Sequence, residues 1–232
     1  MLTLDGISQG QSPRGLPRHE NRDHWYDGRF YDLVIAPHQD ELFARVRDIV
    51  MPQSTVLDVG CGTGRLAFQL GDRCKKFDGV DVSKRNIDVA TGKLARHPAE
   101  NIFFHHSDIF RFLGETANRY DYAVLTYVLH EMDERSRQAI LEALSKAAHE
   151  IIIVDYLAPQ PRTFAGFVNE LIEYVAGPDH YRNFKSFLGA NGLTGLARAA
   201  GHSIIREEQN NPPGTHILVV AGTLISPSDL CW

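Results

Sequence analysis

The sequence contains no long run of apolar residues and no dense cluster of basic ones, and each absence excludes a class of protein. No segment approaches the roughly 20 apolar residues that a membrane-spanning helix needs. The first residues lack a basic stretch followed by an apolar one, so we expect neither a signal peptide nor a membrane partner. Lys and Arg number 24 against 29 Asp and Glu. The net charge of −5 predicts no nucleic-acid partner, because such binding depends on neutralising phosphates.

Cysteine is also scarce, with three residues at Cys61, Cys74 and Cys231. An odd number without the short spacings of a zinc site predicts no disulfide framework and no bound metal. Together with the absence of an export signal, this pattern predicts a cytoplasmic protein, since reducing compartments keep thiols free.

What the chain does have is the composition of a globular protein, with 43% hydrophobic and 23% charged residues. Its 232 residues suffice for one domain with additions. Residues 1–21 are rich in Gly, Pro and polar side chains and are expected to be disordered. We predict a single domain over residues 22–223 and a tail over residues 224–232.

Five apolar segments alternate with helical patterns along the middle of the chain. The strand-like segments cover residues 55–60, 77–82, 101–107, 120–128 and 150–156. This alternation predicts an α/β fold with helices on both faces of a parallel sheet, a doubly wound three-layer α/β/α sandwich. Two more strands, at residues 202–209 and 215–222, are joined by a turn too short for a crossover helix. The predicted sheet therefore has seven strands and is mostly parallel, with an antiparallel last strand.

Two helical additions flank this pattern. Residues 22–50 carry apolar side chains at helical spacing, broken by Pro37, and predict N-terminal helices. Residues 157–184 interrupt the alternation with a further apolar helical segment and predict an insertion after the fifth strand. Because ligands bind at the carboxyl ends of such strands, we expect the insertion to form a lid.

The segment VLDVGCGTG, Val56–Gly64, lies where the first predicted strand turns into a helix. Its glycines allow the backbone to bend sharply and to approach a ligand closely. The following helix directs free N–H groups toward an anionic group. Further along, Asp81 ends the second predicted strand, where a carboxylate accepts hydrogen bonds from ribose hydroxyls. The two features together predict a nucleoside cofactor.

The glycine spacing is G-x-G-x-G rather than the G-x-G-x-x-G of dinucleotide sites, and Asp58 precedes it. This segment resembles the signature of the class I S-adenosylmethionine-dependent methyltransferases, and the resemblance extends from about Trp25 to Gly222. It implies a Rossmann-like domain that binds S-adenosylmethionine, transfers its methyl group and releases S-adenosylhomocysteine.

The resemblance also implies which residues bind the cofactor. The methionine portion of the cofactor would face three glycines, Gly60, Gly62 and Gly64. Asp58 belongs to the same set of cofactor-binding residues. Asp81 would bind the ribose hydroxyls, and Val82 would lie against the adenine.

Further members of the cofactor set follow the third and fourth strands. Asp108 would accept a hydrogen bond from the adenine amino group, beside the Ile109 backbone. Asp108 is an equally good cap for the following helix, and the two roles are compatible. Thr126 would lie beside the methionine tail. An aromatic residue would cover the cofactor, with Tyr31 as the first candidate and Tyr26 as the second.

Methyl transfer needs few side chains, because the protein mainly excludes water and aligns the acceptor with the methyl group. A general base is required where the acceptor must lose a proton. The sequence offers two candidate pairs, His130 with Glu131 after the fourth strand and His180 with Tyr181 in the insertion. The first pair is also consistent with an ordinary helix entrance, so the catalytic residues stay open.

The acceptor is predicted to be a small, partly apolar molecule. The Asn/Asp-Pro-Pro-Tyr segment of many enzymes that methylate amino groups is absent after the fourth strand. Phe164, Phe167 and Tyr174 in the insertion are suited to roof an apolar pocket. Two alternatives remain, a non-catalytic binder of S-adenosylmethionine or S-adenosylhomocysteine and, less favoured by the glycine spacing, an NAD-dependent oxidoreductase. Whether the protein is a monomer or a homodimer stays open.

Overall fold

A computed structural model describes residues 40–161, 170, 173–174 and 177–223. Several predictions lie outside these residues: the disordered segment 1–21, the first N-terminal helix, the cofactor cover by Tyr31 or Tyr26, the roof by Phe164 and Phe167, and the tail 224–232.

The described residues form one seven-stranded sheet in the order β3-β2-β1-β4-β5-β7-β6. The strands are β1 Thr55–Val59, β2 Lys76–Asp81, β3 Ile102–His106, β4 Tyr120–Thr126, β5 Ala148–Tyr156, β6 Ile204–Gln209 and β7 Thr215–Ala221. β7 runs antiparallel to both of its neighbours, whereas the pairs among β1 to β5 are parallel. The predicted fold class is confirmed, including the antiparallel last strand.

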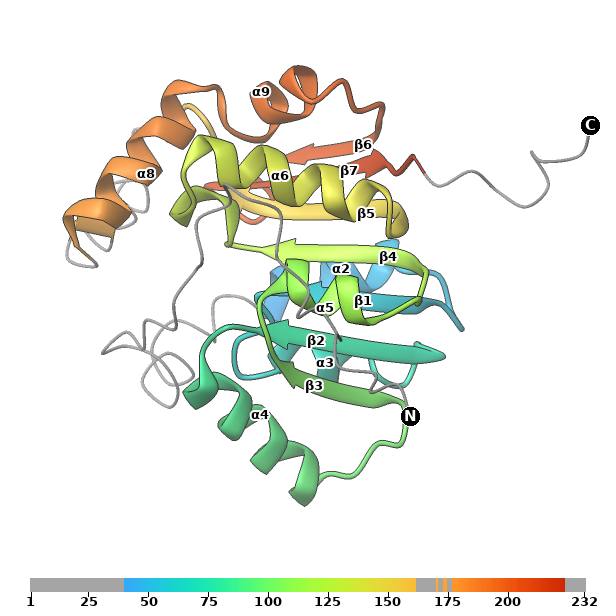
Figure 1. The fold of residues 1–232 in the computed structure, drawn as a ribbon. Coiled ribbons are helices and arrows are strands. Elements are labelled where there is room, and N and C mark those ends of the chain that lie inside the picture. Colours follow the sequence, from blue (N-terminus) through green and yellow to red (C-terminus); the bar gives the residue numbers. More distant parts are fainter. Residues whose placement is uncertain (1–39, 162–169, 171–172, 175–176, 224–232) are drawn as a thin grey trace, which may run out of the picture.

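Helices cover both faces of the sheet, as Figure 1 shows. The α-helices are α2 Asp40–Ile49, α3 Arg65–Leu70, α4 Lys84–Arg96, α5 Ile109–Glu115, α6 Glu134–Ser145, α8 Pro178–Gly189 and α9 Gly192–Ala199, and a 3-10 turn, η2, covers Leu129–Glu131. Apolar side chains of α5, α6, α8 and α9 form one core with the sheet, and those of α2, α3 and α4 form a second core on the other face. Alternate residues of the central strands fill the two cores, as buried parallel strands require.

The main departure from the predicted elements is at the end of the insertion. Helix α8 continues to Gly189, beyond the predicted end of the insertion at residue 184, and a second helix, α9, begins at Gly192. Asn191 and Gly192 both adopt positive φ angles, of 64° and 56°. A Cβ on Gly192 would lie 2.8 Å from the Ala158 Cβ, so the close approach of two segments requires glycine here. At its other end α8 begins at Pro178, so His180 and Tyr181 both lie in its first turn.

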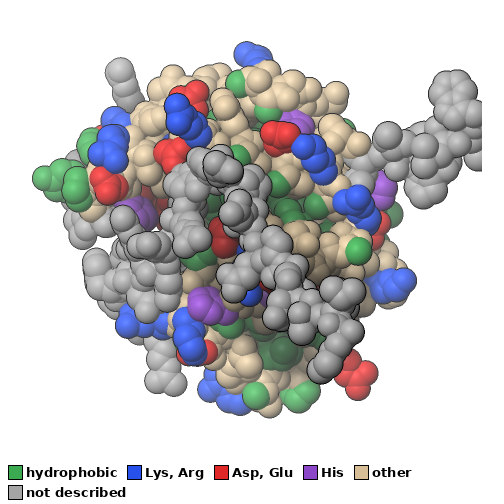
Figure 2. Space-filling view, in the orientation of Figure 1, with side chains coloured by type: hydrophobic (Ala, Val, Ile, Leu, Met, Phe, Trp, Pro, Cys, Tyr) green, Lys and Arg blue, Asp and Glu red, His purple; other side chains and the backbone are tan. Residues whose placement is uncertain are grey.

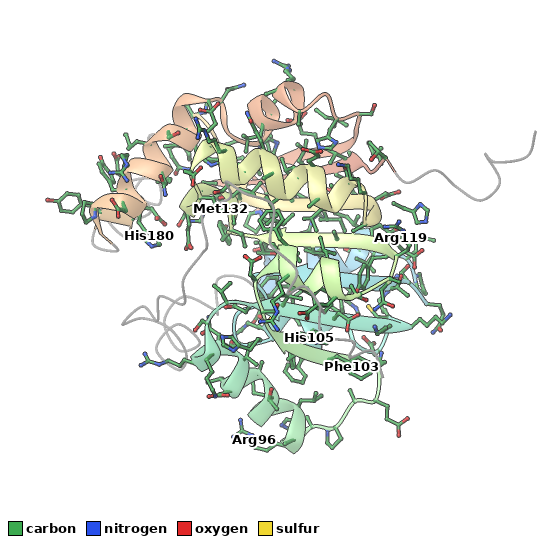
Figure 3. The ribbon with its side chains drawn as sticks, viewed as in Figure 1. Arg96, Phe103, His105, Arg119, Met132 and His180 are labelled. Carbon is green, nitrogen blue, oxygen red and sulfur yellow. The ribbon has the colours of Figure 1, made fainter. Side chains whose placement is uncertain are left out.

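The parallel strands β1 to β5 end at the same edge of the sheet, which we call the carboxyl edge (Figure 1). In Figure 3, Met132 and His180 lie toward this edge and Arg119 lies at the opposite one. No helix among the described residues has the length and apolar character needed to span a membrane.

Candidate functional site

The glycine loop connects β1 to α3 at the carboxyl edge. Gly60, Gly62 and Gly64 have φ angles of 75°, 53° and 77°, a region that favours glycine. A Cβ on Gly60 would lie 2.6 Å from the Val128 side chain, and one on Gly64 would lie 2.5 Å from the Phe104 ring. A Cβ on Gly62 would meet no atom of the described residues within 4 Å. The outer glycines are therefore required by packing, and the central one borders open space.

Asp81 ends β2 and turns its carboxylate toward this loop. Its Oδ2 accepts a hydrogen bond from the Gly62 N–H at 2.8 Å, and its Oδ1 accepts one from the Ser83 N–H at 2.7 Å. Each carboxylate oxygen can accept a second bond. Val82 follows with 36% of its surface exposed, which leaves an apolar side chain beside the carboxylate.

Asp58 lies beneath the same loop and is 2% exposed. Burial, together with the nearby charge of Asp81, raises the pKa of Asp58 to about 8. Asp58 has no ion-pair partner among the residues that the structure describes. The loop thus brings the carboxyl group of Asp58 close to that of Asp81, and this proximity favours the protonated form of Asp58.

Asp108 follows β3 and caps α5. Its Oδ1 accepts hydrogen bonds from the Phe110 N–H at 2.9 Å and the Arg111 N–H at 3.3 Å. The capping prediction is confirmed, and both bonds use the same oxygen, so Oδ2 remains for another donor. The Ile109 side chain points into the core.

Thr126 ends β4, and its hydroxyl is unsatisfied. The Oγ1 atom is buried and has no hydrogen-bond partner in the described part of the chain. A buried hydroxyl without a partner is costly, so this atom marks a position that suits a polar ligand group. The next residue, Tyr127, has a φ of 56°, which is uncommon for a side chain of this size.

His130 lies in the η2 turn and is almost fully buried. Its Nδ1 is 2.7 Å from the Asp155 Oδ1, and its Nε2 is 3.4 Å from the Glu173 Oε1. Burial alone would lower the pKa of His130, but the Asp155 and Glu173 carboxylates raise it well above its usual value. At neutral pH the ring is therefore an imidazolium between two carboxylates. Glu131 is a weaker neighbour, 3.9 Å from Nε2 and with its side chain 45% exposed.

Asp155 ends β5 and orients this histidine. Its Oδ2 accepts hydrogen bonds from the Leu129 and His130 N–H groups at 3.1 and 3.2 Å. Its Oδ1 accepts the Tyr156 N–H at 2.8 Å in addition to the imidazole. Four donors on one buried carboxylate fix both the carboxylate and the ring that it holds.

Tyr156 and Glu173 complete the cluster. The Tyr156 hydroxyl donates to the Glu173 Oε1 at 3.0 Å, and burial raises the pKa of this tyrosine well above its usual value. The Tyr156 ring lies 4.7 Å from the His130 ring and 5.3 Å from the Phe184 ring of α8. We call the four residues His130, Asp155, Tyr156 and Glu173 the buried cluster.

The sequence analysis missed three members of the buried cluster. Asp155 has a signal that was available, because it follows a buried strand in the same way as Asp81. Glu173 is one of two acidic residues, with Glu170, within an apolar helical pattern, which is a second signal. The predicted partner of His130 was Glu131, but the closer carboxylates come from β5 and from the insertion.

Arg137 of α6 supports the cluster from one side and is fully buried. Its Nε donates to the Leu129 carbonyl at 2.8 Å and its Nη2 donates to the Asn183 carbonyl at 2.6 Å. Burial lowers the pKa of Arg137, and the charge of Asp155 opposes that effect. This side chain therefore joins α6, η2 and α8 and places a second cation near Asp155.

The other candidate pair belongs to a different group of side chains. Tyr181 donates to the Glu170 Oε1 at 2.9 Å, which Lys185 also contacts. Tyr181 also packs edge-on against Tyr174 at 5.6 Å between ring centroids. His180 lies at the end of α8 that extends beyond the sheet in Figure 3. Tyr181 is thus engaged with the outer part of the insertion, and its hydroxyl bonds to Glu170 rather than to Glu173.

Known proteins resemble this chain in sequence and in fold. Residues 56–150 match the family model described as a methyltransferase domain. An O-methyltransferase of Penicillium expansum is 27% identical over 65% of this chain and 52% of its own length. A malonyl-[acyl-carrier protein] O-methyltransferase of Halalkalibacterium halodurans is 31% identical over 51% of this chain and 46% of its own length.

A solved structure extends the likeness beyond the matched domain. The magnesium protoporphyrin IX methyltransferase of Synechocystis, with S-adenosylhomocysteine bound, superposes with a TM-score of 0.57. The two chains are 21% identical, and the match covers 85% of this chain and 91% of that one. The chain spans about half the length of the curated relatives named above.

Proposed function

We propose that this protein transfers the methyl group of S-adenosylmethionine to a small molecule, because residues 56–150 match the family model described as a methyltransferase domain. The observation that carries the proposal is the open space beside Gly62, bordered by the Asp81 carboxylate. The glycine loop and Asp81 come from the carboxyl ends of adjacent strands, where sheets of this class bind nucleosides.

The residues present fit S-adenosylmethionine. Asp81 would bind the ribose hydroxyls, with Val82 and the second oxygen of Asp108 beside the adenine. The unsatisfied Thr126 hydroxyl suits the methionine tail. Asp58 lies close to Asp81 and makes no ion pair with a residue that the structure describes, which fits a ligand that carries an ammonium and a sulfonium. Tyr31 remains the residue that we propose to cover the cofactor.

When bound, S-adenosylmethionine supplies an activated methyl group for direct in-line transfer. The chain's own residues bind the cofactor, exclude water and hold the acceptor in line. Of the four proposed catalytic candidates, His130 is positively charged at neutral pH and orients its neighbours. Glu131, His180 and Tyr181 remain candidates for contact with the acceptor.

A small, partly apolar acceptor is favoured over a nucleic acid. On the face shown in Figure 2, described Lys and Arg side chains are dispersed among acidic and apolar ones rather than gathered in one patch. The aromatic rings of Tyr127, Tyr156 and Phe184 lie together near the ends of β4 and β5. We propose that the acceptor binds at this part of the carboxyl edge. The names of the two relatives reported above include methyl transfer to oxygen, which supports methyl transfer but leaves this acceptor to experiment.

Calorimetry with purified protein tests the cofactor. We expect S-adenosylmethionine and S-adenosylhomocysteine to bind and NAD not to bind, because the glycine spacing is G-x-G-x-G rather than the G-x-G-x-x-G of dinucleotide sites. Binding of NAD alone would support an oxidoreductase instead. Mass spectrometry of a metabolite mixture incubated with isotopically labelled S-adenosylmethionine then separates an enzyme from a non-catalytic binder, since only an enzyme yields a labelled product.

A further inference from the structure

We propose that Glu173 accepts the proton of a hydroxyl group on the methyl acceptor, while His130, Asp155 and Tyr156 hold it in place. The inference rests on the proposed methyl transfer and adds the substrate class. The acceptor would be an uncharged molecule whose attacking atom is the oxygen of an ionisable hydroxyl.

The buried cluster lies next to the glycine loop. Val128 contacts the position that a Cβ of Gly60 would occupy, and His130 follows two residues later. Asp155 and Tyr156 end β5, the neighbour of β4 in the sheet. The cluster therefore lies on the acceptor side of the loop that would hold the cofactor.

The Glu173 carboxylate has one occupied oxygen and one available oxygen. Both the Tyr156 hydroxyl and the His130 Nε2 approach Oε1, at 3.0 and 3.4 Å. The Oε2 atom makes no hydrogen bond with any residue that the structure describes, although Glu173 as a whole is 4% exposed. A carboxylate oxygen that lacks a donor, on a side chain that is otherwise largely buried, is a favourable position for a ligand O–H group.

The charges around Glu173 favour a neutral donor over an ammonium group. Two buried carboxylates, Asp155 and Glu173, accompany two buried cations, His130 and Arg137. Leu129 joins Arg137 to Asp155, since its carbonyl accepts from the guanidinium and its N–H donates to the carboxylate. Because the cluster is already balanced, an ammonium group would add an unpaired buried charge, whereas a hydroxyl adds none.

Glu173 is also better suited to accept the proton than His130. An imidazolium carries a proton on both nitrogens and has no free lone pair. His130 therefore fixes the carboxylate and does not compete for the proton at neutral pH.

The proposed step balances. The acceptor oxygen forms a bond to the methyl carbon as the bond between that carbon and sulfur breaks, and the hydroxyl proton passes to the Glu173 Oε2. The negative charge of the carboxylate and the positive charge of the sulfonium disappear together. The products are a methyl ether, a neutral thioether and a neutral carboxylic acid, which later returns its proton to water. Loss of two separated charges is favourable in a site that excludes water.

The test uses labelled S-adenosylmethionine with phenol, aniline and thiophenol as probes. We expect label on phenol oxygen only. Glu173→Gln should lower turnover of phenol by about 100-fold or more, the usual contribution of a general base. Turnover of a nitrophenol that is already ionised should change little, because it needs no base. Glu142→Gln, an exposed carboxylate of α6, is the matched control and should behave as the wild type.

Equal loss on phenol and nitrophenol would assign Glu173 a structural role and overturn the inference, as would preferred methylation of aniline or thiophenol. If no probe is methylated, nitrogen NMR of the His130 ring in the presence of S-adenosylhomocysteine decides. Phenol should shift the signal in the wild type and not in Glu173→Gln, and benzylammonium should have no effect. A shift caused by benzylammonium, or by neither compound, would overturn the inference. Failure of S-adenosylmethionine to bind would instead contradict the proposed function.

Discussion

The carboxyl edge has two halves, which differ in the partners of their buried charged groups. In the proposed cofactor half, formed by the ends of β1, β2 and β3, burial and the nearby charge of Asp81 raise the pKa of Asp58, which forms no ion pair with a described residue. In the acceptor half, formed by the ends of β4 and β5 with η2, Asp155 binds His130 and receives three backbone N–H groups. We propose that a ligand completes the first half, whereas the chain itself supplies most of the partners in the second. Mutations in the two halves should therefore affect different quantities.

The largest expected effect is on stability, in the acceptor half. Asp155→Asn removes the charge that holds the buried imidazolium, and loss of one partner of a buried pair costs about 3–5 kcal/mol. Urea unfolding should show this loss. In the same variant the pKa of His130 should fall, because Asp155 is the main cause that raises it. An unchanged midpoint would mean that the pair contributes nothing to stability.

The second effect is on cofactor affinity, in the other half. Asp81→Ala removes the proposed acceptor of the ribose hydroxyls, which costs about 1.5–3 kcal/mol for charge-assisted bonds. Binding should weaken by about 10- to 100-fold in calorimetry. Asp88→Ala breaks an exposed ion pair with Lys84 on α4 and serves as the control, with unchanged affinity expected. A folded Asp81→Ala protein with wild-type affinity would remove Asp81 from the site.

A smaller, pH-dependent effect is expected at Asp58. Its pKa of about 8 in the folded chain exceeds its ordinary value of 3.8, so its protonated form stabilises the fold. This contribution is complete below about pH 4 and is lost as the pH rises through 8. A cationic ligand should lower this pKa, so binding near pH 7 should release up to one proton. Calorimetry in two buffers of different ionisation enthalpy measures that release, and Asp58→Asn should abolish it.

The smallest effect is expected from the outer part of the insertion. His180→Ala combined with Tyr181→Phe removes a hydroxyl that binds Glu170 at the surface. We expect slower turnover and unchanged cofactor affinity, provided that this segment closes over the acceptor. Wild-type turnover in the double variant would exclude both residues from catalysis.

The cofactor half was more accessible to sequence analysis than the acceptor half, for a physical reason. A glycine loop and a carboxylate at a strand end are local patterns, and Gly62 and Asp81 indeed meet. The partners of His130 are 25 and 43 positions away, on β5 and in the insertion, so their contact depends on the order of strands in the sheet. Glu131 was the expected partner of His130 because it is the next residue in the sequence. A sequence pattern does not show contacts between residues that are far apart in the chain.

The strand pattern was predicted to within about two residues at most ends, because alternation of apolar segments is itself a local signal. The break between α8 and α9 was not predicted. It depends on the approach of Ala158 to Gly192, which brings together segments that lie far apart in the sequence. The charge state of His130 was not predicted either, because it depends on burial and on carboxylates that are distant in the sequence.

The contact between Gly60 and Val128 constrains how this sequence can diverge. With Val128 in place, any side chain at position 60 would lie 2.6 Å from a methyl group, quite apart from the φ of 75°. A related protein that gains a new acceptor through changes in the segment after β4 must therefore keep a residue at position 128 that leaves space for the glycine loop. We therefore expect that, during evolution, Val128 is replaced by a smaller residue before Gly60 is replaced.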